Sequence, residues 1–546
     1  MSARTRLFKA EGREYFYIQD GRMNLVSTND SIWIFGDISK YYDGHSLITN
    51  KEVVLKTIFD NPKNVRYLLG QAFVVTNNDG VEIITSASSP LIYVDTKDDG
   101  CWVFSQDERS FNNRPIPLKD TGFTHQILLR KGEDSIFYDS VISIPPLRIL
   151  NIYKKKLSWR INLSLFDSSH NICEIGEVYS EVKKVISAYT LTADRKIGLL
   201  FSGGVDSLIM SLLTDKTDSY FYFNYNPHYD LEMKLAREFA KKNGRNLTII
   251  NRDSSFNAEN FISYAKKIYP ATIPYKMNFG WKDPSEVDLI LSGQNADTFI
   301  YGDSFSNSSL RGLCGRTLSR LKSINKRLFY FIFSRTMITG ESAKILFADV
   351  FNNTSNEHLS VRLSDLVRLL IRYKFSKFDS IKSHSYHDFT NIDGISSTKK
   401  LSILQWIKII KIIKILPNVV QNAHLVSSFT NVQRLFPYSQ AAAIEKAFWF
   451  RPPFSIILNP KSPSYIFCKK NGVNYFSHVD KINKCLDSLS IKARMRDDSK
   501  IISEVYLGLS AVCEKYKICH LLSDATSTQE QLQELRRINY YLFTNG

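Results

Sequence analysis

The sequence predicts an α/β protein of two domains, in which a β-rich domain precedes a domain with a parallel sheet and a helical tail. The chain has 546 residues, which is too long for one hydrophobic core. Its first part alternates short β-branched or aromatic runs with turn signals, as strands do. Its middle part alternates apolar runs of strand length with helical periodicity, which indicates a parallel sheet with helices on both faces.

The first domain is expected over residues 1–155. Gly and Asn/Asp turn signals, such as the run NNDG at 77–80, separate its short apolar runs. The prolines at 145 and 146 mark its end, and the polar residues 154–172 are interpreted as a linker. Strands are predicted at 31–38, 72–76, 81–85 and 102–105.

The second domain is expected over residues 172–546. It begins with a predicted helix at 174–191, where apolar residues recur every three or four positions. Beyond about residue 305 the chain is mostly helical and basic in character. Between these parts, strands are predicted at 197–201, 221–225, 247–250 and 287–291, with helices at 208–213 and 231–242.

One predicted helix, at 401–416, has an unusual pattern of lysines. Lys408, Lys411 and Lys414 recur every three residues in an otherwise apolar run. The first interpretation is a core helix with one solvated lysine stripe. The alternative is a surface that faces an anionic lipid or an anionic substrate.

Charge and composition narrow the classes of function and location. The net charge of +17 is compatible with an anionic partner, although lysine-rich surfaces account for it equally well. The seven cysteines include no CxxC pair, which suits a reducing compartment. No signal-peptide pattern and no run of 18 apolar residues occur, so we expect a cytoplasmic protein without a transmembrane segment.

The run SGGVDS at 202–207 follows a predicted strand, where ligands bind in open α/β sheets. Its glycines allow a tight turn whose N–H groups point at phosphate oxygens, and its serines add hydroxyl donors. The following helix offers its positive N-terminus. A carboxylate at Asp206 among phosphates requires a Mg²⁺ ion between them. No Gly-Lys-Ser/Thr step follows, which excludes the kinase-type phosphate loop.

These residues resemble known motifs. SGGVDS resembles the pyrophosphatase loop of enzymes that split ATP between its α and β phosphates, including asparagine, lactam, NAD and GMP synthetases and several tRNA-modifying enzymes. The run LSGQNADTFIYG at 291–302 resembles the LSGEGADELFGG element of asparagine synthetase-like enzymes. The run IFCKKNG at 466–472 is similar to the R-x-K-x-G-F segment of that family.

The first domain also resembles part of that family. The runs LGQAF at 69–73, TSASSPLIY at 85–93 and FSQDERS at 104–110 are similar to its Ntn-type glutaminase half, which residues 141–146 would close. The resemblance therefore implies an Ntn-hydrolase-like first domain. It implies an adenine-nucleotide α-hydrolase-like second domain that adenylates a carboxylate.

The resemblance also implies a site for ATP and Mg²⁺. Asp206 and Asp297 would share the Mg²⁺, because two carboxylates from neighbouring strand ends can chelate one octahedral ion with a triphosphate. Lys470 matches the catalytic lysine that stabilises the acylation transition state. The residues implied to bind ATP are Leu200, Ser202, Gly203, Gly204, Asp206, Ser207, Phe223, Ser292 and Gly293.

The sequence departs from the family at three positions. Ser2 stands where a working glutaminase of this type has cysteine, so we expect a degenerate glutaminase domain that acts as a scaffold. Gln294 and Thr298 replace two glutamates of the second motif, which argues against ordinary asparagine synthesis. Departures of the same kind occur in lactam and lasso-peptide cyclases and in relatives thought to amidate uronic acids.

The expected function is therefore amide formation through an acyl-adenylate, with release of AMP and pyrophosphate. The carboxylate is expected on a peptide, an amino acid or a sugar acid, and the amine is not supplied by the chain's own glutaminase. Peptide macrolactam formation and amidation of a small or sugar carboxylate both stay open. The alternatives are asparagine synthesis from ammonia, a tRNA-modifying ATP-pyrophosphatase and an ATP-binding pseudoenzyme. The second motif and the missing cysteine pair argue against a nucleic-acid substrate.

Overall fold

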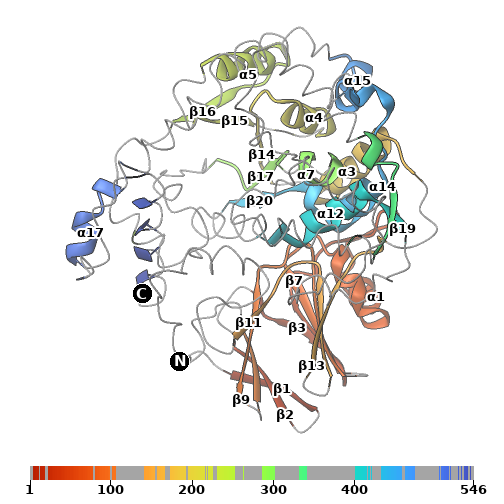
Figure 1. Ribbon diagram of the computed structural model, residues 1–546, viewed down its shortest axis with the longest axis vertical. Helices are drawn as coiled ribbons and strands as arrows, with labels where there is room; N and C mark the ends of the chain where they lie inside the picture. Colours follow the sequence, from red (N-terminus) through yellow and green to blue (C-terminus); the bar gives the residue numbers. More distant parts are fainter. Residues whose placement is uncertain are drawn as a thin grey trace, which may run out of the picture.

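The protein has a mixed α/β fold in which two mainly antiparallel sheets lie at one end and a parallel sheet at the other (Figure 1). The predicted α/β class is confirmed at this level. No helix among the described residues is both long and apolar enough to cross a membrane. The computed structural model describes most of residues 4–105, 141–251, 286–301, 331–343 and 400–473, and scattered positions between 503 and 542.

The N-terminal part contains two sheets that pack face to face. In the first, the strand order is β1-β2-β10-β9-β11, and in the second it is β13-β12-β8-β7-β4-β3. Stacked rings of Phe35 and Phe73, 4.5 Å apart, lie in the core between them. The first sheet comprises β1 (Arg4–Ala10), β2 (Arg13–Ile18), β9 (Ile92–Asp98), β10 (Cys101–Ser105) and β11 (Val141–Ile144). The second comprises β3 (Leu25–Thr28), β4 (Ile32–Gly36), β7 (Ala72–Asn77), β8 (Val81–Thr85), β12 (Arg148–Tyr153) and β13 (Lys156–Ile161).

Alternation of side chains explains why the second sheet has two buried faces. In β4, Trp33 and Phe35 face the first sheet, whereas Ile32 and Ile34 face the rest of the protein. The helices α1 (Lys51–Asp60) and η1 (Pro62–Tyr67) pack on this second face. The predicted linker differs from the structure, because β13 occupies part of it and pairs with β12.

The parallel sheet has the strand order β16-β15-β14-β17-β20, and every neighbouring pair is parallel. The chain therefore enters the sheet at the central strand β14, adds β15 and β16 on one side, and then adds β17 and β20 on the other side. Such a reversal is a topological switch point, and here it lies between β14 and β17. The strands are β14 (Ile197–Leu200), β15 (Ser219–Asn224), β16 (Leu247–Asn251), β17 (Leu289–Ser292) and β20 (Gln433–Leu435).

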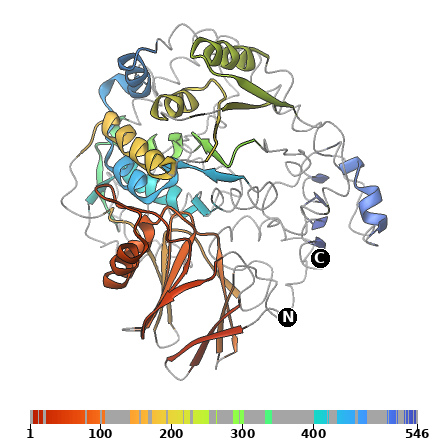
Figure 2. The ribbon, with the colours of Figure 1, turned by 180° about the vertical axis from the view of Figure 1, so that it is seen from behind.

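Helices from distant parts of the sequence cover one face of this sheet. Leu199 and Leu291 point into a core shared with these helices, while Phe221 and Ile290 point to the opposite face. Figure 2 shows α3 and α14 lying between the parallel sheet and the N-terminal sheets. The helices of this core are α3 (Ile175–Thr190), α4 (Val205–Leu213), α5 (Asp230–Lys242), α7 (Ala296–Tyr301), α14 (Ala441–Trp449) and α15 (Ser462–Lys470).

The remaining described elements are short. They include η4 (Pro437–Ser439), which joins β20 to α14, and η5 (Phe454–Ile457), which precedes α15. The sequence analysis predicted helices here and missed β20, the fifth strand of the parallel sheet. The others are β5 (Tyr41–Tyr42), β6 (Leu47–Ile48), β18 (Met337–Thr339), β19 (Lys400–Ser402), α12 (Ile403–Lys414) and α17 (Ser510–Lys515).

The lysine-striped segment forms a core helix, as the first interpretation predicted, but the solvated stripe and the surface facing an anionic partner are both wrong for Lys408 and Lys411. These lysines are 1% and 4% exposed within α12. The Lys408 Nζ donates hydrogen bonds to the carbonyl oxygens of Ala447 at 2.7 Å and Phe450 at 3.4 Å. Carbonyl groups at the C-terminal end of α14 therefore replace the water that a solvated lysine would have used. The side chain of Lys414 lies outside the described residues.

Candidate functional site

The two sequence motifs leave the parallel sheet side by side at its carboxyl edge. In the β14–β17 pair, Ile197 is opposite Leu289 and Leu200 is opposite Ser292. The SGGVDS loop starts just after Leu200, and the second motif continues from Ser292. Both loops thus flank the switch point of the sheet, which is where open α/β sheets bind ligands.

The first loop makes a tight turn into α4. Gly203 has a φ of +77°, a left-handed conformation that favours glycine, and a Cβ on it would lie 3.3 Å from the backbone nitrogen of Ala236 in α5. Gly204 is the N-cap residue of α4. Because glycine has no side chain, the first turn of α4 receives no side-chain cap from this position.

Hydrogen bonds within the loop orient its two serines. The Ser202 Oγ accepts from the Gly204 N–H at 3.3 Å and lies 3.3 Å from the Ser207 Oγ. The Ser207 hydroxyl also donates to the Gly204 carbonyl oxygen at 2.9 Å. Ser202 is exposed, whereas Ser207 is buried. Both serine hydroxyls therefore support the turn, and Ser202 does so at the protein surface.

Gly293 connects the second motif to the first loop. A Cβ on Gly293 would lie 2.9 Å from the Asp206 carbonyl oxygen and 3.1 Å from the Met210 Cγ. These distances leave no room for a side chain, so the two motifs touch through their backbones. The Gln294 N–H donates to the Ser292 Oγ at 3.2 Å, which shapes the turn after β17.

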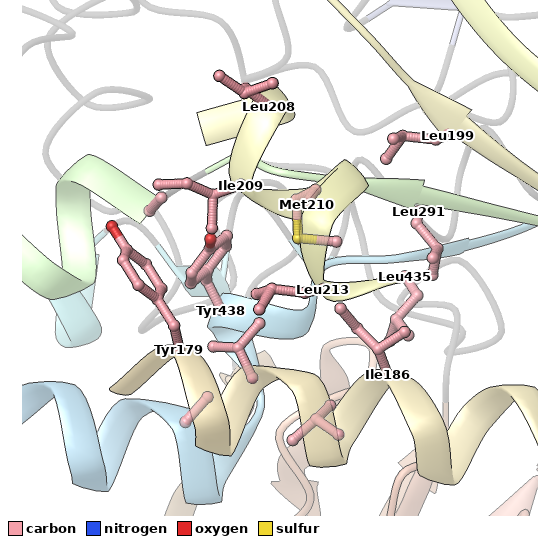
Figure 3. Close-up of a cluster of buried hydrophobic side chains, with 14 of the residues drawn as sticks. Tyr179, Ile186, Leu199, Leu208, Ile209, Met210, Leu213, Leu291, Leu435 and Tyr438 are labelled. Carbon is pink, nitrogen blue, oxygen red and sulfur yellow. The ribbon is translucent and has the colours of Figure 1, made fainter. Parts of the chain in front are cut away.

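A hydrophobic cluster holds α4, and with it the loop, in place. Met210 and Leu213 of α4 pack with Ile186 of α3 and with Leu291 and Leu435 from the sheet. Figure 3 shows these side chains turned toward one another between α3, α4 and the sheet. The amphipathic pattern of α4 thus places its apolar face in the core and its first turn at the sheet edge.

Helix α15 lies beside Asp206. Cys468 of this helix is fully buried, and burial together with the nearby Asp206 carboxylate raises the pKa of its thiol to about 12. Burial likewise raises the pKa of the Tyr179 phenol, and Asp206 adds to this effect. Both groups stay protonated at neutral pH. Asp206 itself is partly exposed.

Lys470 is not brought to the loop by its position in α15. It is the last residue of the helix and is exposed. A helix turns by about 100° per residue, so Lys470 points away from the direction of Cys468, two residues earlier. The structure therefore places this lysine on the surface at the end of α15, and its predicted catalytic role stays a prediction.

The other predicted site residues are placed as follows. Phe223 lies in β15 next to the sheet edge, and Asp297 is the second residue of α7, but their side chains lie outside the described residues. No group of three or more His, Cys, Asp or Glu side chains that could hold a metal ion occurs in the part of the chain that the structure describes. Ser2 lies outside the described residues.

Three buried residues of the helices next to the two loops, Tyr179, Tyr301 and Ser464, were not predicted from the sequence. The Ser464 hydroxyl lies 2.6 Å from the Tyr179 hydroxyl and 2.5 Å from the Tyr301 hydroxyl. Ser464 and Cys468 are one helical turn apart in α15. This spacing of two small residues is a sequence signal that could have indicated a buried face of the helix there.

Comparisons of the chain with protein-family models and with curated proteins find no match. The function of the site is therefore inferred from its own geometry and from the motifs that form it. Both motifs follow parallel strands, both contribute glycines at close backbone contacts, and both contain an aspartate.

Proposed function

We propose that the protein is an asparagine synthetase-like ligase that uses ATP to activate a carboxylate as an acyl-adenylate and then forms an amide. One observation supports this most strongly. The SGGVDS loop and the second motif flank the switch point of the parallel sheet, and Gly293 touches the backbone of Asp206. The carboxyl edge at a switch point is where open α/β sheets bind nucleotides, and here both motifs of the proposed ATP site lie at that edge.

The residues present fit a triphosphate. The turn at Gly203 and the bare N-cap at Gly204 leave the first N–H groups of α4 without a side-chain cap, and these groups attract anionic oxygens. Helix α4 has nine residues, enough for its dipole to contribute. Ser202 is exposed at the same turn, and its hydroxyl, which lies 3.3 Å from the Ser207 Oγ, would turn to a phosphate oxygen as a further donor.

Asp206 and Asp297 would hold a Mg²⁺ ion with the phosphates. Asp206 lies in the first turn of α4 and Asp297 in the first turn of α7, directly after two adjacent strands. When bound, the ion would neutralise negative charge that develops on the pyrophosphate leaving group. The carboxylates would also keep the triphosphate in one orientation relative to the α4 N-terminus.

The proposed reaction has two steps. A carboxylate oxygen of the substrate attacks the α-phosphorus, the bond to the β-phosphate oxygen breaks, and pyrophosphate leaves. An amine nitrogen then attacks the acyl carbon, loses a proton, and AMP leaves with the oxygen that had joined it to the acyl group. Binding both reactants in one pocket would supply much of the rate enhancement, because a reaction between separate molecules becomes a reaction within one complex.

The proposal extends to the domains and the substrates. An Ntn-like first domain with Ser2 in place of cysteine would act as a scaffold, so the amine would come from a second substrate or from the same molecule. The carboxylate is proposed on a peptide, an amino acid or a sugar acid, and the location is proposed to be cytoplasmic. Cyclisation of a peptide and amidation of a sugar acid both agree with the site.

The products of ATP cleavage test this function. Purified protein would be incubated with ATP, Mg²⁺, an amine and candidate carboxylates, and nucleotides would be separated by chromatography. We expect AMP and pyrophosphate in equal amounts, in a reaction that depends on the carboxylate. ADP with inorganic phosphate would contradict the proposal. Binding of ATP without cleavage for any carboxylate would favour the pseudoenzyme, which the changes at Gln294 and Thr298 also allow.

A further inference from the structure

Three buried hydroxyl groups meet where α3, α7 and α15 come together, and we call Tyr179, Ser464 and Tyr301 the hydroxyl node. The Ser464 Oγ lies 2.6 Å from the Tyr179 hydroxyl and 2.5 Å from the Tyr301 hydroxyl. Ser464 is fully buried and neither tyrosine is more than 7% exposed. A hydroxyl without a partner in such surroundings costs about 1–3 kcal/mol, so the node favours one arrangement of the three helices.

The node joins the helix that contains Asp297 to the helix beside Asp206. Tyr301 is the last residue of α7, one helical turn after Asp297. Helix α15, which contains Ser464, packs against α4, whose first turn contains Asp206. The node therefore connects, through α15, the two helices that contain the aspartates.

Helix α7 depends on such an anchor because it is short. It has six residues, and isolated helices of fewer than about 12 residues are marginal in water. Its position must therefore come from tertiary contacts. Phe299 and Ile300 supply non-directional apolar burial, whereas the Tyr301 hydroxyl supplies a directional bond at the end of the helix.

We propose that Ser464 is a positioning residue for the metal site: by bonding Tyr301 and Tyr179 together, it holds α7 where Asp297 and Asp206 can share one Mg²⁺ ion. This inference rests on the proposed function. It assigns no contact between Ser464 and ATP, because Ser464 is fully buried. Loss of a group that orients a metal ligand typically changes metal affinity by about 10–100-fold, and because Ser464 would act through one further contact we expect the lower end of that range.

The test measures Mg²⁺-dependent binding of ATP and needs no knowledge of the carboxylate. The melting temperature of the full chain would be followed at one ATP concentration while MgCl₂ is titrated. The variants are Ser464→Ala, which removes the shared hydroxyl, Ser464→Thr, which retains it, and Tyr301→Phe, which removes one hydroxyl but keeps the ring. The control is Tyr189→Phe, because Tyr189 is also a buried tyrosine of α3 and bonds Ser88 instead.

For Ser464→Ala and Tyr301→Phe we expect the Mg²⁺ concentration at half of the ATP-induced shift to rise about tenfold. Ser464→Thr and Tyr189→Phe should stay within about twofold of the unsubstituted protein, even where the melting temperature without ligand falls. Should Ser464→Ala not fold, Tyr301→Phe decides the question, because it is nearly isosteric.

Each contrary result has a different meaning. If the unsubstituted protein shows no ATP- and Mg²⁺-dependent shift, the proposed function and the positioning role both fail. If it shows the shift but Tyr301→Phe has an unchanged Mg²⁺ midpoint, the positioning role alone fails. An equal rise for Tyr189→Phe would also overturn it, since the effect would then be a general loosening of the core.

Discussion

Gly293 lies against the peptide group of Asp206, so close that a Cβ on the glycine would be 2.9 Å from the aspartate carbonyl oxygen. The two residues are far apart in the sequence and come from different strand–loop–helix units. Their contact makes the SGGVDS loop and the second motif one continuous surface at the sheet edge. Changes on either side of this contact should therefore affect both loops.

Substitution of Gly293 by alanine should separate the two motifs. The added methyl group would meet the Asp206 backbone and the Met210 side chain, and overpacking of this kind costs about 1–3 kcal/mol. We expect the free energy of unfolding in urea to fall by that amount. We also expect the ATP-dependent rise in melting temperature to be lost. Gly176→Ala is the control, because a Cβ there has open space around it within a helix, and it should not destabilise the protein. If Gly293→Ala and Gly176→Ala had the same free energy of unfolding and the same response to ATP, the close contact at Gly293 would be contradicted.

Removal of either site carboxylate should abolish adenylation. Asp206→Asn and Asp297→Asn are each expected to lower pyrophosphate–ATP exchange by about 10³-fold or more, since a metal clamp contributes several kcal/mol at about 1.4 kcal/mol per tenfold. The double variant should be little worse than the worse single one, because the two carboxylates act as a unit. Exchange would be measured with the carboxylate that supports pyrophosphate release. Near-normal exchange in either single variant would reject the metal role.

A buried carboxylate should stabilise the contact between the two parts of the protein. Glu445 of α14 accepts hydrogen bonds from the Tyr67 hydroxyl at 2.8 Å and the Ser164 N–H at 2.6 Å, and its Oε1 lies 3.7 Å from the Arg66 Nε. Glu445→Ala leaves these groups without their acceptor and should cost about 3 kcal/mol. The free energy of unfolding in urea measures this loss.

The control for Glu445 is another glutamate paired with a cation. Glu14 of β2 pairs with Arg6 at 2.9 Å, but its side chain is 39% exposed. Solvent screens such a pair, so Glu14→Ala should cost no more than about 1 kcal/mol. A loss as large as that of Glu445→Ala would show that burial does not decide the difference.

The buried Lys408 should make stability depend on pH. Burial lowers the pKa of Lys408 to about 7, well below its ordinary value near 10.5. Unfolding therefore takes up a proton between about pH 7 and 10.5, and this residue makes the fold more stable as the pH rises through that window. The free energy of unfolding of the unsubstituted protein should rise by about 1.4 kcal/mol per pH unit relative to Lys408→Met. Urea unfolding of both proteins at pH 7, 8 and 9 checks this, and a constant difference would contradict it.

The first domain is expected to release no ammonia from glutamine. In the proposed assignment, Ser2 would stand where a working glutaminase has cysteine, and a serine hydroxyl needs a dedicated base that a thiolate does not. Purified protein incubated with glutamine and ATP should produce no glutamate above the blank. Stoichiometric glutamate that disappears in Ser2→Ala would show instead that the domain is catalytic.

The local units of the fold could be predicted from the sequence. The strands β8 and β14 and the helices α3 and α5 lie where periodicity and apolar runs predicted them, within about three residues. The SGGVDS loop was also placed correctly between a strand and a helix. These features depend on neighbouring residues alone, so a single sequence contains their signal.

The sequence by itself determined the strand–loop–helix units, the α/β class and the position of the two glycine-containing loops. Only the tertiary structure decided that β20 completes the sheet, that Lys408 is buried against carbonyl groups of α14, and that Ser464 bonds two distant tyrosines. The physical reason is that burial and partner choice depend on contacts between residues far apart in the chain. A short strand such as β20 or a lone serine has no periodicity of its own. A lysine in an apolar helix shows the same sequence pattern whether water or the carbonyl groups of a helix end accept its hydrogen bonds.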